Sequence, residues 1–230
     1  FYFIKRFKVI PRFAYKKLLN FKKIFKLLII NFNIFIRTVL LTFSFFWITY
    51  LGSTLGEEYV AVNAVLLQLI FISSFFLDAY AFSTEGIIGY SLGKKSLKMF
   101  SSTVKNSLIL SFITGVLISI FFLFLAKEII NLITDLEFLR FLTYKYLIWI
   151  IFIPPIASIA YQLDGIFIGA TQTKELRNAM IVSVTIYLFL SVFLTKQLHN
   201  YGIWFSLLLF MILRASTLHF YFSKILNQFR

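Results

Sequence analysis

Long apolar stretches separated by short polar segments divide most of the chain. Each reaches or approaches the ~20 residues that an α-helix, rising about 1.5 Å per residue, needs to cross about 30 Å of hydrocarbon. The ~10-residue alternating segments of a transmembrane β-barrel do not occur in the sequence. The predicted spans cover about residues 32–51, 62–90, 106–126, 146–170, 179–197 and 202–223. The pattern therefore predicts an all-α integral membrane protein with six transmembrane helices.

Five charged residues interrupt these apolar stretches. They are Arg37, Asp78, Glu85, Asp164 and Arg214. A charge at membrane depth costs at least ~2.5–3.5 kcal/mol on insertion scales, so such residues usually face a partner or a water-filled cavity. Three acids against two bases leave one carboxylate without a partner, and we expect it to bind a proton or a cation. The set therefore indicates a pathway, with a static ion network between helices as the alternative.

The depth of these charges suggests how they pair. Arg37, Glu85 and Asp164 each lie about six residues from the predicted cytoplasmic end of their span, which places them in one layer. Because Arg37 and Glu85 belong to consecutive spans, we expect them to form an ion pair. Glu85, Arg37 and Arg214 are candidates for a gating network, although a static role for Glu85 and Arg37 fits equally well. Asp78 and Asp164 are the candidates for ion coupling.

Polar residues of the second predicted span fall on one side of a helix. At about 100° per residue they occupy a stripe about 80° wide, which should face protein or water and not lipid. The stripe consists of Asn63, Ser74, Asp78, Glu85 and Gly89. We expect Asn63, Gln68 and Ser74 to line a cavity.

Residues 1–30 differ from the rest because apolar and basic residues interleave there, as in the run from Phe13 to Lys26. This pattern suits a helix in the cytoplasmic interface with its lysines toward anionic headgroups, and it also suits a connection from an earlier span. We therefore expect an interfacial linker over residues 1–30 and a six-helix transmembrane lobe over residues 31–230. The sequence opens without Met, which suggests a fragment of a longer protein.

The composition supports a membrane protein and orients it. Hydrophobic residues make up 60% of the chain, whereas soluble domains have about 45–50%. If the first residues are cytoplasmic, the segments outside the spans on the cytoplasmic side carry seventeen Lys and Arg residues, and those on the opposite side carry four. The four are Lys127, Arg140, Lys145 and Lys196. This positive-inside pattern predicts that both termini are cytoplasmic, and it explains the net charge of +14 without a nucleic-acid partner.

The sequence lacks the residues that several kinds of metal, phosphate-binding and catalytic sites require. There is no cysteine, and the two histidines, His199 and His219, lie at opposite ends of the last predicted hairpin. Phosphate-binding glycine loops, H-E-x-x-H motifs and Ser–His–Asp sets are missing. We therefore expect neither an enzyme, nor a metal site, nor a cofactor.

One long run carries a family resemblance. Residues 163–180, from Leu163-Asp164-Gly165 to Asn178-Ala179-Met180, resemble the tenth helix and following loop of MATE (multidrug and toxic compound extrusion) transporters, with closest similarity to the DinF-like branch. Supporting runs are residues 31–38, 61–68, 77–86 and 207–214. The resemblance covers nearly the whole chain. It implies helices seven to twelve of a twelve-helix transporter, whose N-terminal six-helix lobe is the expected partner.

The resemblance also implies roles for particular residues. Asp164 is at a position similar to that of the acidic residue on helix ten that binds the coupling cation in the NorM-like branch. That branch also uses a glutamate on helix seven, whereas the corresponding region here, from Arg37 to Leu41, contains no acid. The sodium site of that branch is therefore not reproduced in full, and the coupling ion is expected to be sodium or a proton.

These expectations define a function and its alternatives. We expect an antiporter of the bacterial inner membrane that exports small organic compounds, often cationic or amphiphilic, in exchange for sodium or protons. A flippase of lipid-linked saccharides from the same superfamily is one alternative. It should have a strongly cationic cavity, whereas the five intramembrane charges sum to −1. A non-transporting membrane partner, or the remnant of a split gene, is another alternative.

Overall fold

The computed structural model describes residues 20–229, and within that range the chain is almost entirely helical, with no strand. Its elements are α3 (Phe21–Leu55), α4 (Glu57–Gly93), α5 (Leu97–Ile133), α6 (Glu137–Tyr144), α7 (Leu147–Gly169), α8 (Thr173–Leu198), α9 (Asn200–Leu226) and a 3-10 turn (Asn227–Phe229). In this range 6 helices, all but the short α6, are long and apolar enough to cross a membrane. The predicted all-α membrane lobe is therefore confirmed.

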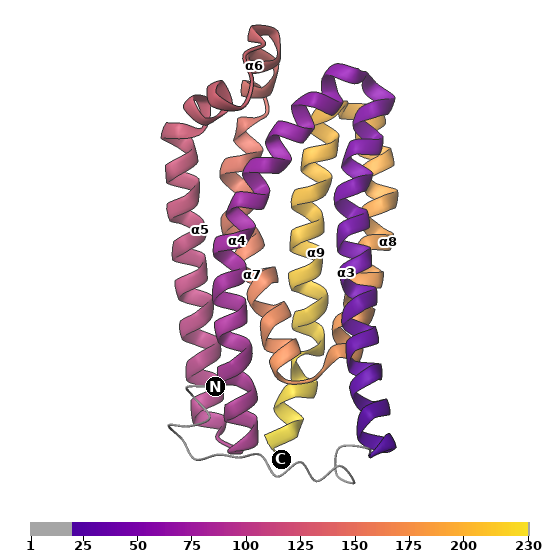
Figure 1. Ribbon diagram of the computed structural model, residues 1–230, viewed down its shortest axis with the longest axis vertical. Coiled ribbons are helices and arrows are strands. Elements are labelled where there is room, and N and C mark those ends of the chain that lie inside the picture. Colours follow the sequence, from indigo (N-terminus) through magenta and orange to yellow (C-terminus); the bar gives the residue numbers. More distant parts are fainter. Residues whose placement is uncertain (1–19, 230) are drawn as a thin grey trace, which may run out of the picture.

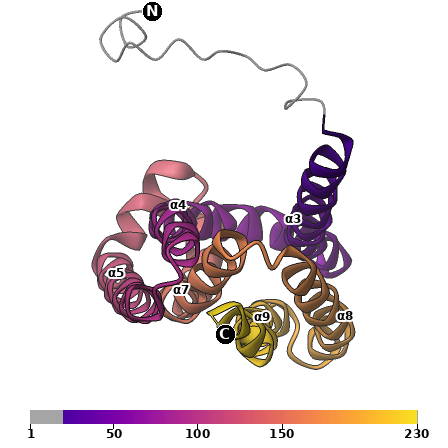
Figure 2. The ribbon, with the colours of Figure 1, turned by 90° about the horizontal axis from the view of Figure 1, so that it is seen from below.

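The long helices run side by side, and α6 joins α5 to α7 at one end of the bundle (Figure 1). α7 is central, because it packs against α4, α5 and α9, while α3 packs chiefly on α8 (Figure 2). α3 and α4 meet at Gly56 and diverge toward their other ends, so that α7 and α9 are visible between them (Figure 1). The two halves of the bundle are thus joined at its centre by α7 and α9.

The first helix begins earlier than the predicted span. Asn20 caps α3, and its side-chain oxygen accepts a hydrogen bond from the backbone N–H of Lys23 at 3.3 Å. Residues 21–30 form the first turns of α3. The long aliphatic stems of their lysines can lie along apolar surface while the charged ends reach water, so lysines are compatible with the end of a membrane helix. An interfacial role for residues 1–30 stays a prediction, and residues 1–19 lie outside the described part.

Close approach between α4 and α7 depends on two glycines. A Cβ atom added to Gly165 would lie 2.6 Å from the carbonyl oxygen of Ala81, and one added to Gly169 would lie 2.5 Å from that of Glu85. Real side-chain atoms do not come so close, so only glycine fits at either position. Small residues are the usual means by which membrane helices approach closely. This contact sets the position of Asp164, the residue before Gly165.

α7 continues through Pro154 and Pro155 without a break. A proline removes the hydrogen bond to the carbonyl four residues earlier, so Pro155 leaves the carbonyl of Ile151 without its helical donor. Ser119 of α5 supplies a replacement, because its hydroxyl lies 2.5 Å from the oxygen of Ile151. In hydrocarbon such a carbonyl has no water to bind, and a neighbouring serine satisfies it.

Candidate functional site

The centre of the lobe contains one carboxylate held by two arginines. Asp164 of α7 accepts hydrogen bonds through Oδ2 from Arg37 of α3 and from Arg214 of α9, the latter at 2.5 Å. We call these three residues the Asp164 triad. It joins three helices that are far apart in the sequence. Such an ion pair between helices is how buried membrane charges are usually accommodated.

The two arginines differ in their surroundings. The side chain of Arg214 is 1% exposed, whereas that of Arg37 is 14% exposed. The guanidinium carbon of Arg214 lies 5.4 Å from the ring centre of Tyr161 and 5.7 Å from that of Phe210, distances at which aromatic rings attract a cation. Arg214 is therefore fixed on several sides, and Arg37 is the more accessible partner of Asp164.

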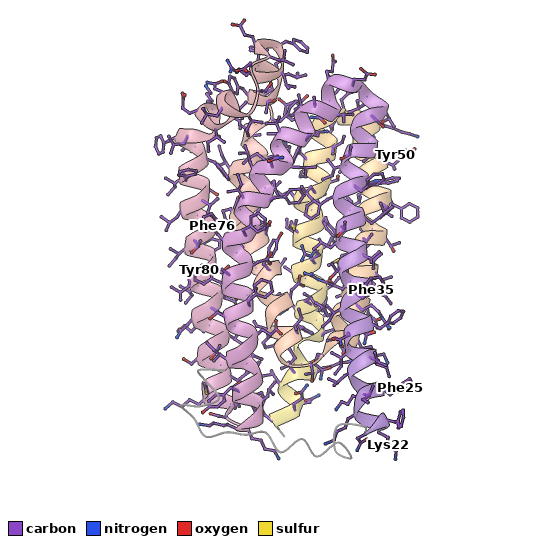
Figure 3. The ribbon with its side chains drawn as sticks, in the orientation of Figure 1. Lys22, Phe25, Phe35, Tyr50, Phe76 and Tyr80 are labelled. Atoms are coloured by element: carbon purple, nitrogen blue, oxygen red, sulfur yellow. The ribbon has the colours of Figure 1, made fainter. Side chains whose placement is uncertain are left out.

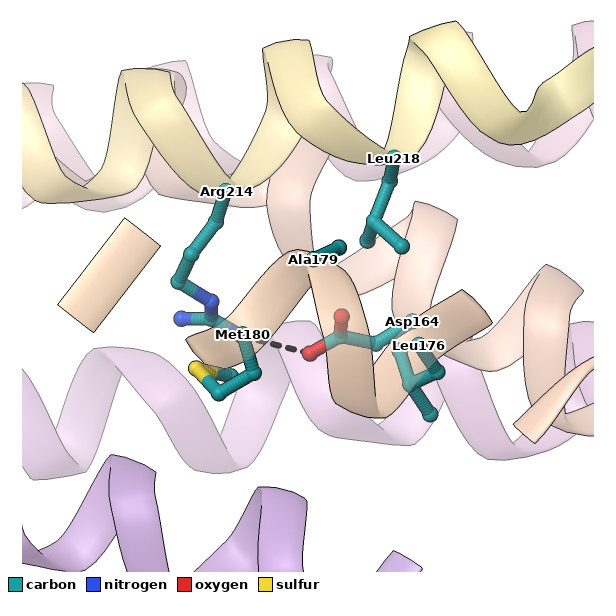
Figure 4. A pocket seen from close by; sticks show the side chains of 6 residues that line it. All are labelled: Asp164, Leu176, Ala179, Met180, Arg214 and Leu218. Atoms are coloured by element: carbon teal, nitrogen blue, oxygen red, sulfur yellow. Dashed lines mark hydrogen bonds and ion pairs between the residues drawn. The ribbon is translucent and has the colours of Figure 1, made fainter. Parts of the chain in front are cut away.

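Apolar side chains close the site on the side of α8. Leu176, Ala179 and Met180 of α8 and Leu218 of α9 surround the pair of Asp164 and Arg214, and the space between them does not admit a water molecule. Figure 4 shows one carboxylate oxygen of Asp164 directed at Arg214 and the other toward Ala179 and Leu218. With little water nearby, the charges of the triad are weakly screened and strongly coupled.

The triad is not saturated. Oδ1 of Asp164 and the Nε atoms of both arginines are buried without a hydrogen-bond partner among the described residues. Two arginines and one carboxylate also carry a net charge of +1. Asp78 of α4 is close enough to be attracted by both arginines, although no ion pair joins it to either in residues 20–229. In its ionised form Asp78 would balance this charge.

The predicted pair of Arg37 and Glu85 is wrong, because Arg37 binds Asp164. Arg37 and Asp164 lie at one level, as their ion pair shows, but Glu85 packs opposite Gly169, one helical turn beyond Gly165. α3 and α4 also diverge toward this end of the bundle (Figure 1). Glu85 is half-buried and forms no ion pair with any described residue. Two carboxylates, Asp78 and Glu85, are thus left over instead of one.

The expected cavity-lining residues are not brought together. Asn63 is 1% exposed, donates to the side chain of Asn200 at 2.8 Å and accepts from the indole of Trp204 at 2.9 Å. It therefore packs between helices. Gln68 is exposed, and Ser74 is half-buried beside Tyr161. Of the three, only Ser74 lies near the triad.

Tyr161 belongs to this site but was absent from the sequence prediction. It is three residues before Asp164 on α7, a spacing that places two side chains on the same face of a helix. That spacing was the available signal. Its ring already contacts Arg214, so Tyr161 is a further candidate for a residue that lines the site.

Comparisons with known proteins agree with this architecture. The family model described as MatE matches residues 34–194. The chain is 34% identical over 199 residues to "DNA damage-inducible protein F" of Escherichia coli (strain K12), a match that covers 86% of this chain and 42% of that protein. It is 27% identical over 195 residues to "Protein DETOXIFICATION 42" of Arabidopsis thaliana, with 81% and 36% covered. The chain thus spans less than half the length of these relatives. It belongs to the MatE family.

Proposed function

We propose that this chain is the C-terminal lobe of an antiporter that exports small organic compounds, often cationic or amphiphilic, across the bacterial inner membrane in exchange for sodium or protons. Membership of the MatE family and six apolar helices support a multi-pass transporter. The chain spans less than half of its relatives, so an N-terminal six-helix lobe is the proposed partner. The asymmetry of basic residues supports cytoplasmic termini.

The Asp164 triad is the observation that carries this proposal. An ion can drive a conformational change only if it binds one state better than the other. A cation or proton that binds Asp164 must compete with an arginine already bound there. Arg37 is the more exposed of the two, so it is the one that the ion displaces. Ion binding then detaches α3 from α7 while Arg214 keeps α9 in place.

Asp78 gives the displaced arginine a second partner. It lies on α4, carries no ion pair among the described residues and already attracts Arg37. In this scheme Arg37 pairs with Asp164 when the ion is absent and with Asp78 when the ion is bound. Two discrete arrangements of one side chain are the kind of element that both an ion and a substrate can bias.

Gradient-driven export by the full natural protein that carries this chain tests the proposal. One variant is Asp78→Asn; the other is the double variant Asp164→Asn with Arg214→Gln, which keeps the summed charge of the triad. Asn keeps the shape of Asp and can still form hydrogen bonds, and the double variant leaves no second arginine without a counterion, so both variants should reach the membrane. We expect at least one to lose dye export from vesicles under an imposed sodium or proton gradient. Asp135→Asn, at an exposed carboxylate, is the control.

The proposal fails if both variants export at the wild-type rate with an unchanged response to the gradient. It also fails if the control loses as much activity as they do, because the loss would then not be specific to the membrane carboxylates.

A further inference from the structure

A groove separates the first turns of α3 from the turn between α7 and α8. It has a volume of about 420 Å³ and is lined by Lys22, Phe25, Lys26, Ile29 and Asn33 of α3 and by residues 171–175. We call it the α3–α8 groove. We infer that it binds an anionic phospholipid, whose phosphate contacts the lysines and whose acyl chain lies along the apolar side chains. The inference rests on the proposed orientation, in which this end of the lobe faces the cytoplasmic leaflet.

The charge of the groove is unbalanced. Lys22, Lys26 and Lys174 form no ion pair with any residue in 20–229, and the carboxylate in the groove, Glu175, is neutralised by Lys224 at 2.9 Å. Three positive charges are therefore left for a ligand. Residues 1–19 contain six Lys and Arg residues and no acid, so that stretch of the chain cannot neutralise them. An anionic partner from outside the chain fits these charges.

The beginning of α8 adds to this preference. Lys174 occupies its first turn, where the helix dipole repels a cation, and the N-cap residue Gln172 makes no side-chain capping bond. The first N–H groups of a helix have no partner within the helix. A phosphate at this position would relieve the repulsion and accept these donors.

Apolar side chains line the groove beside the lysines, as a phospholipid requires. Phe25 is 65% exposed and Ile29 is 48% exposed. Figure 3 shows Lys22 and Phe25 projecting from the lower end of α3, with Phe35 higher along the same helix. In the proposed orientation Lys22 thus lies toward the headgroups, and Ile29, two helical turns further along α3, lies toward the bilayer interior.

Hydrogen bonds between helices form the floor of the groove. Asn33 donates to the hydroxyl of Thr173 at 3.3 Å and accepts from Arg177 at 2.9 Å, so that α3 is tied to α8. A lipid above this floor would hold the same two helices together. Arg37 follows Asn33 by one helical turn, so the bound lipid would favour the arrangement in which Arg37 holds Asp164.

Binding to the purified full natural protein that carries this chain tests the inference. Phosphatidylglycerol is titrated in detergent, and bound lipid is counted by native mass spectrometry. The groove variant is Lys22→Gln, Lys26→Gln and Lys174→Gln. Its affinity should fall by roughly 100-fold, since each lysine near a membrane surface contributes about a fivefold attraction. The control variant is Lys94→Gln, Lys95→Gln and Lys98→Gln, which removes the same charge at the same end of the bundle and should bind as the wild type does.

Phosphatidylcholine and inorganic phosphate distinguish the possible ligands. Neither should displace phosphatidylglycerol at equal concentration. An equal loss in both triple variants would overturn the inference, because it would show diffuse attraction. Full displacement by inorganic phosphate would overturn it too, since the site would then take any anion. If the groove variant does not fold, the wild-type protein is labelled with a photoactivatable phosphatidylglycerol instead. Labelling of residues 22–33 and 171–175 supports the site, and labelling elsewhere contradicts it. The experiment measures lipid binding and not transport, so its failure can be distinguished from failure of the proposed function.

Discussion

Arg37 of α3 and Asp164 of α7 form an ion pair across the bundle, although they are 127 positions apart in the sequence. The pair joins α3 to α7 in the part of the bundle where α3 and α4 have diverged (Figure 1). Since Arg214 binds the same carboxylate oxygen, Asp164 carries the attraction of two cations at once. The stability of the lobe and its response to ions should therefore depend on this one residue.

Removal of Asp164 alone should be more harmful than removal of Asp164 together with an arginine. Asp164→Asn leaves two cations without a counterion, and a broken buried pair typically costs about 3–5 kcal/mol. The double variant Asp164→Asn with Arg214→Gln leaves only Arg37, the more accessible cation, and should unfold at a higher temperature than the single variant. Thermal unfolding of the full natural protein in detergent measures both. Glu85→Gln, at a carboxylate outside the triad, is the control and should change little.

A double variant less stable than Asp164→Asn alone would contradict the pairing of Asp164 with Arg214. A large loss of stability in Glu85→Gln would instead place Glu85 in the network, as the sequence had suggested.

A second prediction concerns Ser119 and the carbonyl of Ile151. Ser119→Ala leaves that carbonyl without a donor and should lower the unfolding free energy by about 1–2 kcal/mol. Pro155→Ala restores a backbone N–H that can bond to Ile151, so Ser119→Ala should cost much less in that background. A double-mutant cycle on thermal unfolding measures this difference. Ser53→Ala, at an exposed serine that bonds to a carbonyl of its own helix, is the matched control.

Equal cost of Ser119→Ala with and without Pro155 would contradict the account, because the carbonyl freed by proline would then not be what Ser119 satisfies.

Much of the fold, but less of the site, could be predicted from the sequence. Span length and hydropathy depend only on local composition, which is why the six helices and the buried charges were identified. The partner of Arg37 depends on which face of α3 meets α7 and on how α4 and α7 approach each other through Gly165. Neither property is visible in a single span. Asn63 shows the same limit, because its partners Asn200 and Trp204 come from the distant α9.

A third prediction distinguishes glycines that permit helix contact from glycines that do not. Gly165→Ala would place a Cβ atom 2.6 Å from the backbone oxygen of Ala81, so α4 and α7 must separate. Overpacking of this kind costs about 1–3 kcal/mol. Gly86 of α4 has no neighbouring atom within 4 Å of an added Cβ. Gly86→Ala should therefore raise stability slightly, since alanine favours a helix by up to about 1 kcal/mol. Unfolding temperatures that fall equally in both variants would contradict the close contact.

The last prediction concerns orientation in the membrane. Glu57 begins α4 at the end where α3 and α4 meet, and Lys95 follows α4 at the opposite end. The excess of Lys and Arg at the Lys95 end predicts that this end is cytoplasmic. This chain contains no cysteine, and the full natural protein without the substitution gives the background labelling. In intact cells, Glu57→Cys should react with a membrane-impermeant thiol reagent, whereas Lys95→Cys should react only after permeabilisation. The opposite labelling pattern would reverse the orientation, and the α3–α8 groove would then face the outer leaflet.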